Sequence, residues 1–592
     1  MKPTQGTTRT TAALTRGLGG FRWSLARPDE GLVARLGFET DEPELLLRCL
    51  VNRGVTTPEG VEQFLNPDFR SHLHDPYLLR DMGKAVERIR RALRDRERQL
   101  VTVDFDVDGS TSGLILSSVL RMLGAGDLAS LYIPDRFTEG YGLSGDTVRR
   151  AAADGVKVII TADIGIKSKA EATLARAFGI DLIICDHHLP DGEEVPDDAY
   201  AVICPKGSSG ESYPNRHLAA CGVSLKLAEA LLTGDPRHER LLDSLVKLVA
   251  IGTVGDLVDI AEPENRAIVA YGLRALNEQK HNPGLRALLE VARVGDPITA
   301  YDLGFKLGPR INAAGRITHA SAVIELFNAR TMEEARRLAR VLDDLNAKRQ
   351  TIQYALEERL MKEIATARPL RDKVLLFTGG EADGYHRGVV GIVASRIVEM
   401  TGRPTLVAAI NAEGMAHGSC RSIAGFPMVE ALDFAQDLLV KYGGHPMAAG
   451  FTVTVENIDR LRCRLNEYAD GQLSEDDLGR LLTADAELTL DEISAVTVET
   501  LARLAPFGMG NPAPLFLFRS LPLRKIRLLK ERHLKLTVGR RGNTLDALWW
   551  NSAEHQARLA GASEVSLIAS LEINSWQGAE SLQLKVADLA VH

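Results

Sequence analysis

Apolar and polar positions follow two different spacings along the first half of the chain. Between about Leu100 and Asp256, short runs of consecutive apolar residues, such as LVTV and LIIC, alternate with stretches of helical spacing, such as SGLILSSVLRMLGAG. Runs that are apolar on both faces are typical of buried parallel strands, and helices between such runs are typical of a doubly wound sheet. We therefore predict an α/β domain with a parallel sheet in residues 45–327.

A long stretch of helical spacing follows this domain. Residues 328–368 include TMEEARRLARVLDDLNAKRQTIQYALEERLMKEIATA, which contains neither glycine nor proline. Leu338, Val341, Leu342 and Leu345 recur at helical spacing, so the segment is predicted to form one long helix that connects two domains. A homodimeric coiled coil is the alternative, but the seven-residue repeat is not clean, and we expect a monomer.

The last third of the chain changes from alternating helices and strands to strands alone. KVLLFTGG, GVVGIVASRIVEM, RPTLVAAI and HGSCRSI predict a second α/β domain in residues 369–470. Residues 471–520 are predicted to form a helical linker that ends in the Pro/Gly-rich turn PFGMGNPAPLF. Residues 521–592 hold about five short strand-like runs, the pattern of a small β-barrel. Residues 1–44 are expected to form an N-terminal tail and entry segment.

Acidic side chains and histidines gather at the ends of the apolar runs. VTVDFDVDG, VIITADIGI and DLIICDHHLP each place Asp or His directly after a strand-like run, and VAIGTVGDLVDI adds another Asp. Ligands of open α/β sheets bind beyond the carboxyl ends of the strands, so these side chains should share one cleft. So many carboxylates would repel one another without cations, and Mn²⁺ or Mg²⁺ suits oxygen ligands with one or two imidazoles. The set comprises Asp104, Asp106, Asp108, Asp163, Asp186, His187, His188 and Asp256.

Composition limits the class of protein without indicating a substrate. The net charge is −8 and the sequence pI is about 6.0, so any nucleic-acid-binding surface must be local. No uninterrupted apolar stretch reaches the roughly 20 residues of a membrane span. The six cysteines are scattered without a C-x-x-C pair, which argues against a zinc site and favours a reducing compartment, the cytoplasm.

The order of the motifs resembles that of a known family. DFDVDG, the Asp of TADIGI, DHH and the Asp of VGDLVDI resemble the four successive motifs of the DHH phosphoesterase superfamily. GPRINAAGR, GSCRSI and GGHPMAAGF then follow as in the RecJ family of single-strand-specific 5′→3′ DNA exonucleases. The resemblance implies a DHH catalytic domain, a connector helix, a DHH-associated domain and a C-terminal OB-fold barrel. It also implies release of 5′-mononucleotides in DNA repair and recombination, with single-strand binding protein as a partner.

By the same resemblance, the acidic cluster holds two divalent metal ions, Mn²⁺ or Mg²⁺. Asp163 would bridge the ions, as two-metal hydrolysis requires. The remaining ligands would be Asp108, His187 and Asp256 in one site and Asp106 with Asp104 in the other. A helix cap is the alternative role for Asp256.

The resemblance also assigns a catalytic set of His188, Arg310 and Asp186. His188 would touch the phosphate or transfer a proton, and Asp186 would orient its neighbours, as metal-bound imidazoles require. Arg310 would contact the scissile phosphate, because a guanidinium binds phosphate in a bidentate manner. Asn312 and Arg316 of the same GPRINAAGR motif would contact the substrate.

Further substrate contacts are implied in the C-terminal half. Ser419 and Arg421 resemble a pocket for a 5′-terminal phosphate, which would set polarity. His445 would line the substrate groove, or serve only in packing. Trp549 is the candidate for stacking on a base, although one of Trp549 and Trp550 should face the core because strand neighbours alternate. The basic side chains of the barrel are Arg524, Lys525, Arg527, Lys530, Arg532, Lys535, Arg540 and Arg541.

Two alternatives to a single-strand exonuclease remain open. One is a DHH phosphodiesterase that acts on short oligonucleotides or signalling nucleotides, and the other is an inactive DNA-binding scaffold. The appended barrel and the connector helix argue against the first, because a small substrate needs no extended groove. The retention of every motif carboxylate argues against the second.

Overall fold

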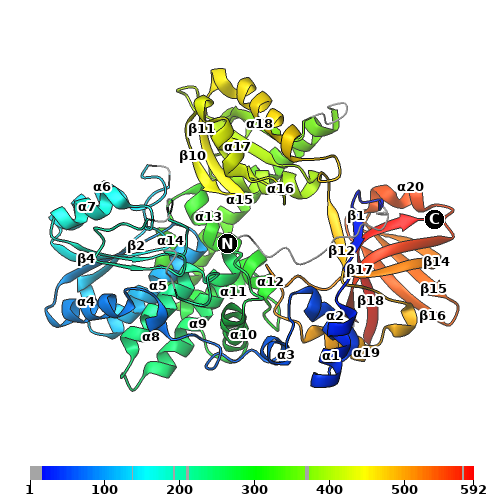
Figure 1. Cartoon of the computed structure of the whole chain (residues 1–592), viewed down its shortest axis with the longest axis horizontal. Coiled ribbons are helices and arrows are strands. Elements are labelled where there is room, and N and C mark those ends of the chain that lie inside the picture. The colour runs from blue at the N-terminus through cyan, green and yellow to red at the C-terminus, as the bar shows by residue number, and fades with distance from the viewer. Residues whose placement is uncertain are drawn as a thin grey trace. The chain divides into compact units, whose positions relative to one another are not determined.

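The computed structural model describes residues 16–136, 138–190, 192, 194–207, 212–366, 372–576 and 579–592 (Figure 1). Contacts between residues divide the chain into two compact units. The first unit contains Glu62–Gln350 and Pro506–Pro512, and the second contains the other described residues. Up to residue 15, the predicted tail lies outside the described residues. None of the described helices combines the length and the apolar character needed to cross a membrane.

The second unit begins with a strand and a helix inside the predicted entry segment. β1 (Arg22–Leu25) pairs in parallel with β12 (Leu481–Ala484), from the last quarter of the chain. α1 (Glu30–Thr40) follows, and the side chain of its N-cap Asp29 accepts a hydrogen bond from the amide of Leu32. Two short helices follow it: α2 (Glu44–Asn52), and α3 (Pro58–Leu65), within which the first unit begins at Glu62.

The second α/β domain is confirmed, with a mixed five-stranded sheet of order β10-β11-β9-β8-β7. Strands β7 and β8 are parallel, and the other pairs are antiparallel. One face packs on α16 (Val390–Thr401) and the other on α17 (Met428–Phe434) and α18 (Ile458–Gln472). The strand bounds, in the order of the sheet, are Leu439–His445, Ala448–Thr454, Met415–Arg421, Thr405–Ile410 and Leu375–Gly380.

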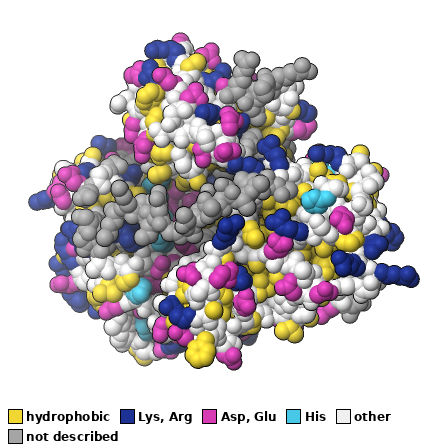
Figure 2. Space-filling model, turned by 45° about the vertical axis from the view of Figure 1, so that its right-hand side comes forward, with side chains coloured by type: hydrophobic (Ala, Val, Ile, Leu, Met, Phe, Trp, Pro, Cys, Tyr) yellow, Lys and Arg dark blue, Asp and Glu magenta, His cyan; other side chains and the backbone are white. Residues whose placement is uncertain are grey.

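A closed five-stranded barrel forms the C-terminal part, as predicted. β14 pairs with both β15 and β17, β15 with β16, β16 with β18, and β18 with β17. The first strand begins at Phe516, ahead of the expected start at residue 521, because Phe516 and Phe518 are fully buried in the barrel. Lysine and arginine side chains are spread over the exposed surface of the barrel (Figure 2). The strands β14 to β18 span Phe516–Leu529, His533–Arg540, Asn543–Trp549, Glu564–Trp576 and Ala579–Val591.

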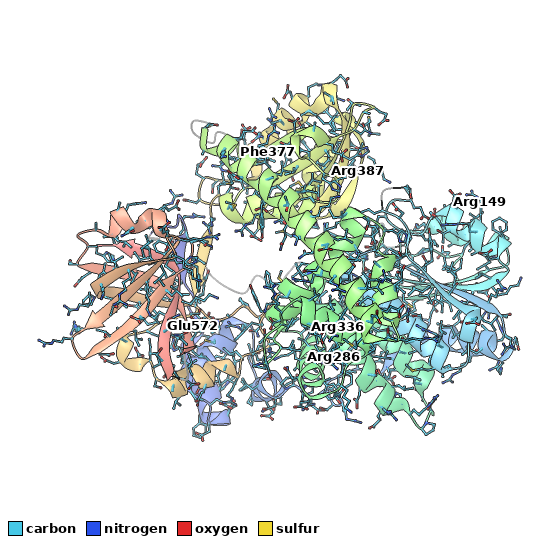
Figure 3. All side chains as sticks on the ribbon, turned by 180° about the vertical axis from the view of Figure 1, so that it is seen from behind. Arg149, Arg286, Arg336, Phe377, Arg387 and Glu572 are labelled. Atoms are coloured by element: carbon cyan, nitrogen blue, oxygen red, sulfur yellow. The ribbon has the colours of Figure 1, made fainter. Side chains whose placement is uncertain are left out.

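The predicted connector is a single helix, α15 (Met332–Thr366). Its first turns belong to the core of the first unit, and Leu356 and Leu360 belong to the core of the second α/β domain. Arg336 of α15 lies beside Arg286 of α11 (Pro283–Val291), and both guanidinium groups donate to Glu290 (Figure 3). The predicted end of the helix, residues 367–368, lies outside the described residues.

The first unit contains the predicted parallel sheet, of order β3-β2-β4-β5-β6. All four strand pairs are parallel. α6 (Gly145–Ala153) and α7 (Lys169–Ala177) cover one face of the sheet, and α4 (Met82–Arg94), α5 (Val107–Met122) and α8 (Ala220–Leu232) cover the other (Figure 1). The strands β2 to β6 span Arg98–Val103, Ala129–Tyr132, Val156–Ala162, Asp181–Cys185 and Ala201–Ile203.

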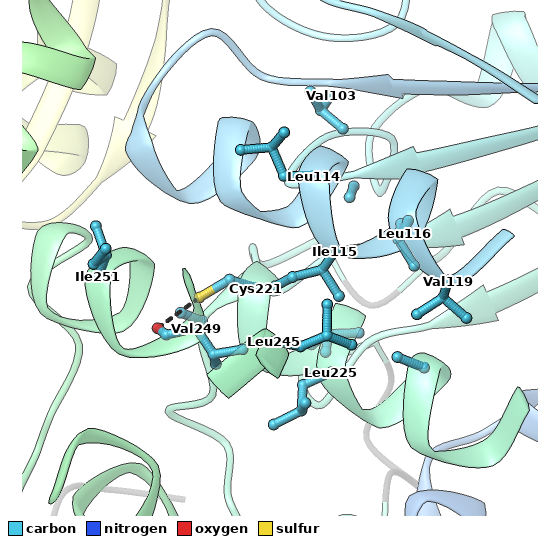
Figure 4. Close-up of a cluster of buried hydrophobic side chains, with 14 of the residues drawn as sticks. Val103, Leu114, Ile115, Leu116, Val119, Cys221, Leu225, Leu245, Val249 and Ile251 are labelled. Carbon is cyan, nitrogen blue, oxygen red and sulfur yellow. Dashed lines mark hydrogen bonds between the residues drawn. The ribbon is translucent and has the colours of Figure 1, made fainter. Parts of the chain in front are cut away.

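The core of the first unit surrounds α5, which is buried along nearly all of its length. Val103 of β2 packs above α5, and Leu225 of α8 and Leu245 of α9 (His238–Gly255) pack below it (Figure 4). Burying one such side chain stabilises the fold by roughly 1.5–3 kcal/mol. A helix buried on all sides needs partners on all sides, and further helices of the first unit provide them. They are α10 (Pro263–Glu278), α12 (Ala300–Asp302), α13 (Gly308–Ile317) and α14 (Ser321–Asn328).

Candidate two-metal site

The sheet order brings three of the sequence motifs to one edge. The chain passes from β2 to β3 on one side and then crosses back to β4 on the other side of β2, so the order reverses beside β2. Ligands of open α/β sheets bind at such a reversal, beyond the carboxyl ends of the strands. Asp104, Asp163 and Asp186 each follow directly after one of the adjacent strands β2, β4 and β5.

Backbone amides at the starts of α5 and α8 fix the carboxylates of Asp106 and Asp108. Asp106 is the N-cap of α5, and its Oδ1 accepts hydrogen bonds from the amides of Asp108 (2.9 Å) and Gly109 (3.1 Å). Both carboxylate oxygens of Asp108 accept hydrogen bonds of 2.8 Å from the first two amides of α8. A side chain at Gly109 would place its Cβ 2.4 Å from the carbonyl oxygen of Asp104, so this turn requires glycine.

Asp163 lies in a strained backbone conformation at the end of β4. Its φ is 64°, a left-handed value that costs energy for residues other than glycine. Its amide donates to the carbonyl of Cys185 (3.0 Å), and the next turn uses Gly165 with φ 118°. A Cβ at Gly165 would lie 2.6 Å from Oγ1 of Thr161. The turn holds the Asp163 carboxylate against the centre of the cluster.

His187 joins the acidic groups contributed by different elements. Its Nε2 lies 3.3 Å from Oδ1 of Asp163, 3.7 Å from Oδ2 of Asp256 and 3.8 Å from Oδ2 of Asp108. Asp256 is the C-cap of α9, so a capping position and a place in the cluster are compatible. The described residues contain three compact groups with ligand atoms within 4.8 Å: Asp108–His187–Asp256, Asp104–Asp106–Asp163 and Asp163–His187–His188.

The electrostatics of the cluster match the chemistry of a divalent cation site. Burial, reinforced by repulsion from Asp106, raises the pKa of Asp108 to about 6 and the pKa of Asp104 well above its ordinary value. Burial and the charge of Asp108 likewise raise the pKa values of Asp163 and Asp256. Buried carboxylates this close are unfavourable as anions unless cations neutralise them. The donor set of carboxylates and imidazole fits Mn²⁺ or Mg²⁺.

Asp186 organises the histidine pair. Its Oδ1 accepts hydrogen bonds from the amides of His187 (2.7 Å) and His188 (3.1 Å) and contacts Nδ1 of His188 at 2.8 Å. Burial opposes the charge of Asp186, but the hydrogen bond and the charges of the two histidines outweigh it and lower the pKa. Burial also opposes the positive charge of His188, yet the hydrogen bond to Asp186 and the surrounding carboxylates raise its pKa. The geometry agrees with an orienting role for Asp186.

The helix α13, which carries GPRINAAGR, packs against the loop after β2. Gly315 permits this contact, because a Cβ there would lie 2.7 Å from the carbonyl oxygen of Phe105. Oδ1 of Asn312 accepts a hydrogen bond from the amide of Val107 (2.7 Å), so Asn312 supports the metal-binding loop. Arg310 is oriented by Asp343 of α15 (2.9 Å) and by the carbonyl of Lys306 (2.7 Å). Arg316 is partly exposed in the last turn of α13.

Three residues beside the cluster were missed in the sequence. The Tyr141 hydroxyl donates to the carbonyl of Asp163 (3.2 Å) and lies 3.4 Å from both ring nitrogens of His188. Arg136 stacks over the ring of Phe105, and its charge partly offsets the effect of burial on the pKa of Asp104. The charge of Lys206 likewise partly offsets the effect of burial on the pKa of Asp256. All three lie in loops after strands, so their position beyond strand ends was the available signal.

Ser419 and Arg421 meet on β9 of the second α/β domain. Nη1 of Arg421 donates to Oγ of Ser419 (2.7 Å). Both side chains lie against the first turn of α16, where a Cβ at Gly391 would be 3.0 Å from Oγ of Ser419 and 3.4 Å from Nη2 of Arg421. A helix N-terminus beside an arginine and a hydroxyl is suited to an anion. His445 ends β10, opposite Ala448 of β11.

The two adjacent tryptophans of the barrel face opposite sides. Trp549 is 5% exposed and stacks on His555, with ring centroids 4.8 Å apart. Trp550 is 49% exposed and contacts His533 edge to face. The prediction of Trp549 as the base-stacking residue is therefore revised in favour of Trp550, because pleating turns Trp549 into the barrel core.

Comparison with known proteins gives the same assignment for each part. Family models match residues 98–253 (DHH family, N-terminal domain), 372–471 (DHHA1 domain) and 484–588 (RecJ OB domain). The single-stranded-DNA-specific exonuclease RecJ of Bacillus subtilis is 36% identical over 96% of this chain and 71% of its own length. The Escherichia coli protein of the same name is 36% identical over 92% of this chain and 96% of its own length.

A solved structure extends the likeness to the whole fold. The crystal structure of RecJ from Thermus thermophilus in complex with Mn²⁺ matches with a TM-score of 0.80 and 30% identity. The match covers 96% of this chain and 79% of that protein. With the acidic motifs gathered at one sheet edge and the same domains in the same order, this chain belongs to the RecJ family of single-stranded-DNA-specific exonucleases.

Proposed function

We propose that this chain is a metal-dependent exonuclease that hydrolyses single-stranded DNA from the 5′ end and releases 5′-mononucleotides in DNA repair and recombination. One observation carries the proposal: carboxylate oxygens of Asp108, Asp163 and Asp256 all lie within 3.8 Å of Nε2 of His187. Such a group is costly without cations and well suited to bind them. Family membership adds the substrate class.

The donor set would divide between two ions, with Asp163 close to both groups. Asp108, His187 and Asp256 would hold one ion, and Asp104 with Asp106 would hold the other. Two bound divalent cations supply charge neutralisation at the phosphate and a lowered pKa for the attacking water. The backbone amides at the starts of α5 and α8 fix the carboxylates before any ion arrives, which reduces the cost of binding.

His188 is the proposed proton donor. Asp186 accepts the hydrogen bond at Nδ1 and so keeps that nitrogen protonated, which leaves Nε2 of His188 to act on the substrate. Release of a 5′-mononucleotide frees the 3′ oxygen of the terminal nucleotide, and this oxygen requires a proton. The hydrogen bond to Asp186 raises the pKa of His188 and favours the imidazolium form that donates it. The Tyr141 hydroxyl lies 3.4 Å from both ring nitrogens of His188.

Arg310 is proposed to bind the scissile phosphate. A guanidinium stabilises the charge that develops on phosphoryl oxygens, provided that its orientation is fixed in advance. Asp343 and the carbonyl of Lys306 provide that orientation. Asn312 acts through the loop after β2, and Arg316 completes the substrate contacts of α13.

The polarity of digestion is proposed to come from Ser419 and Arg421. Together with the first turn of α16, they form a site for a 5′-terminal phosphate. Recognition of the end of a strand excludes internal cleavage and 3′ ends. His445 is proposed to line the path of the strand.

The barrel is proposed to hold the single strand through stacking and phosphate contacts. Trp550 offers an exposed ring, and seven of the eight predicted basic side chains are exposed. Lys535 is the eighth, half-buried and paired with Asp546 (2.8 Å). Barrels of this kind bind single strands with stacked aromatic rings in a basic groove.

We further propose a monomer that works in the cytoplasm on strands presented by single-strand binding protein. The six free cysteines, of which five are buried, are compatible with a reducing compartment. Naked single strands are scarce in cells, so an enzyme of this specificity needs access to coated strands.

One experiment separates the proposal from the two alternatives. The purified full chain with Mn²⁺ is given a long single strand labelled at the 5′ or the 3′ end, a duplex, and a dinucleotide. We expect mononucleotides from the single strand, with the 5′ label released first. Cleavage confined to the dinucleotide would support the small-substrate phosphodiesterase, and binding without cleavage would support the scaffold.

A further inference from the structure

A short Pro/Gly-rich segment belongs to the metal-binding unit although its flanking residues do not. Pro506–Pro512, with the sequence PFGMGNP, makes its contacts within the first unit, whereas the chain on both sides belongs to the second. The segment follows α19 (Ala495–Ala502) and precedes the first barrel strand. We name it the 506–512 hook. The function proposed above gives it no role.

The hook has a defined shape and a buried anchor. The backbones of Gly508 and Asn511 form an isolated antiparallel β-bridge. Nδ2 of the fully buried Asn511 donates to the carbonyl of Pro506 (2.9 Å). Arg266 of α10, also fully buried, donates to the carbonyl of Pro506 (3.4 Å) and to the carbonyl of Phe64 (2.6 Å). The guanidinium lies 3.8 Å from the centre of the Phe64 ring. A buried charge with this many partners fixes the hook in one place.

The tip of the hook touches the chain three and four residues after Asp256, the proposed metal ligand. The amide of Ile260 donates to the carbonyl of Met509 (2.9 Å). A Cβ at Gly510 (φ 75°) would lie 1.7 Å from Oδ1 of Asp259, and a Cβ at Gly508 would lie 2.7 Å from Cδ1 of Ile260. No side chain fits at Gly510 unless Asp259 moves.

Asp256 depends on this part of the chain for its position. It caps the C-terminus of α9, and the next residue, Leu257, takes a left-handed φ of 60° as the chain reverses. Two contacts then fix the reversed chain: Nδ2 of Asn265 donates to the carbonyl of Asp259 (2.8 Å), and the hook binds the amide of Ile260. A displaced Asp259 would pull on the turn that aims the Asp256 carboxylate.

We infer that the 506–512 hook is a positioning element for the metal site of Asp108, His187 and Asp256. Residues that lie in the sequence between the second α/β domain and the barrel would thus complete the metal site of the first unit. This inference rests on the proposed two-metal function. It makes Gly510 a positioning residue that acts through Asp259 and the turn at Leu257.

The test is Mn²⁺ binding by the full chain without DNA, by calorimetry and by the spectrum of bound Mn²⁺. Gly510→Ala should weaken one of the two binding events by roughly 10–100-fold, the usual effect of losing support behind a ligand. The other event, at Asp104, Asp106 and Asp163, should stay unchanged. Gly414→Ala is the matched control: its φ is 74°, and a Cβ there meets nothing within 4 Å. The control should bind both ions as the unmodified chain does.

Two further variants decide the remaining outcomes. Asp259→Ala combined with Gly510→Ala removes the carboxylate that the new Cβ meets, and should restore much of the lost affinity. Gly508→Ala, which meets only the flexible end of Ile260, should show a smaller loss and decides the matter if Gly510→Ala does not fold. Equal Mn²⁺ binding by folded hook variants and the unmodified chain overturns the inference and leaves the proposed function standing. An unmodified chain that binds no Mn²⁺ overturns both.

Discussion

At the scale of single residues, the metal site is arranged before any ion binds. Asp106 caps α5, Asp108 accepts hydrogen bonds from two backbone amides of α8, and Asp163 is held in a left-handed turn. Each device fixes a carboxylate close to others that repel it. The protein therefore stores an unfavourable charge arrangement at the place where cations would relieve it.

Asp163→Asn should separate charge from shape. Asparagine tolerates the left-handed backbone as aspartate does, so the turn after β4 should persist. Without the buried charge, the metal-free variant should unfold at a higher temperature than the unmodified chain, while hydrolysis falls by roughly 10²–10³-fold or more. Thermal unfolding with chelator and digestion with Mn²⁺ measure the two effects. Asp198→Asn, in an exposed ion pair with Arg176, should change neither. Unfolding at a lower temperature would contradict the stored repulsion.

The raised pKa values of the clustered aspartates predict how the stability of the metal-free protein, and its stabilisation by Mn²⁺, depend on pH. A carboxyl whose pKa is higher in the folded protein favours folding at low pH, and this contribution is lost as the pH rises through the folded-state pKa. Asp108, with a pKa of about 6 against an ordinary 3.8, and Asp104, Asp163 and Asp256 all shift upward. The chelator-treated chain should therefore lose stability as the pH rises from the ordinary pKa of Asp108, 3.8, through its folded-state value of about 6, and Mn²⁺ should raise Tm more at the higher pH. A larger rise at the lower pH would be the wrong sign.

At the scale of elements, sequence periodicity predicted those strands and helices whose signal lies within a short stretch of the chain. The apolar runs of β2, β4 and β5 and the turn-separated runs of the barrel each carry their signal within a few residues. The pairing of β1 with β12 and the docking of the 506–512 hook depend on contacts between distant segments, which no local pattern encodes. The strand ends also predicted which acidic residues meet, but alternation alone could not decide which tryptophan faces inward.

The packing of α13 on the loop after β2 gives a prediction at this scale. Gly315→Ala places a Cβ 2.7 Å from a backbone oxygen of Phe105, and neither helix nor loop can yield without moving Asn312 or Asp106. We expect weaker Mn²⁺ binding and at least a tenfold loss of turnover, with about 1–3 kcal/mol less stability from overpacking. Calorimetry and digestion test this. Gly83→Ala in α4, where a Cβ meets nothing within 4 Å, should be neutral or slightly stabilising. If both variants behave alike, the close packing of α13 is not important for the site.

At the scale of the whole molecule, the proposed tasks fall on different parts of the chain. The first unit holds the acidic cluster, whereas the proposed phosphate site at Ser419 and Arg421 and the basic barrel belong to the second. The 506–512 hook is the exception, since it returns to the first unit between two segments of the second. A strand long enough to use every part should bind more tightly than a short one, because its binding energy comes from several sites.

Trp550 tests this division of tasks. Trp550→Ala should weaken binding of long single strands by roughly 1–3 kcal/mol, the value of one base stacked on an aromatic ring, and leave cleavage of a dinucleotide nearly unchanged. Trp549→Ala should instead destabilise the barrel by roughly 3–5 kcal/mol, because its ring is buried. Titrations of labelled strands at fixed ionic strength and thermal unfolding measure these effects. Phe178→Ala, which removes a ring of similar exposure (46%) from the first unit, is the control. If Trp550→Ala reduces long and short substrates equally, the barrel is not the anchor, and the strand must be held elsewhere.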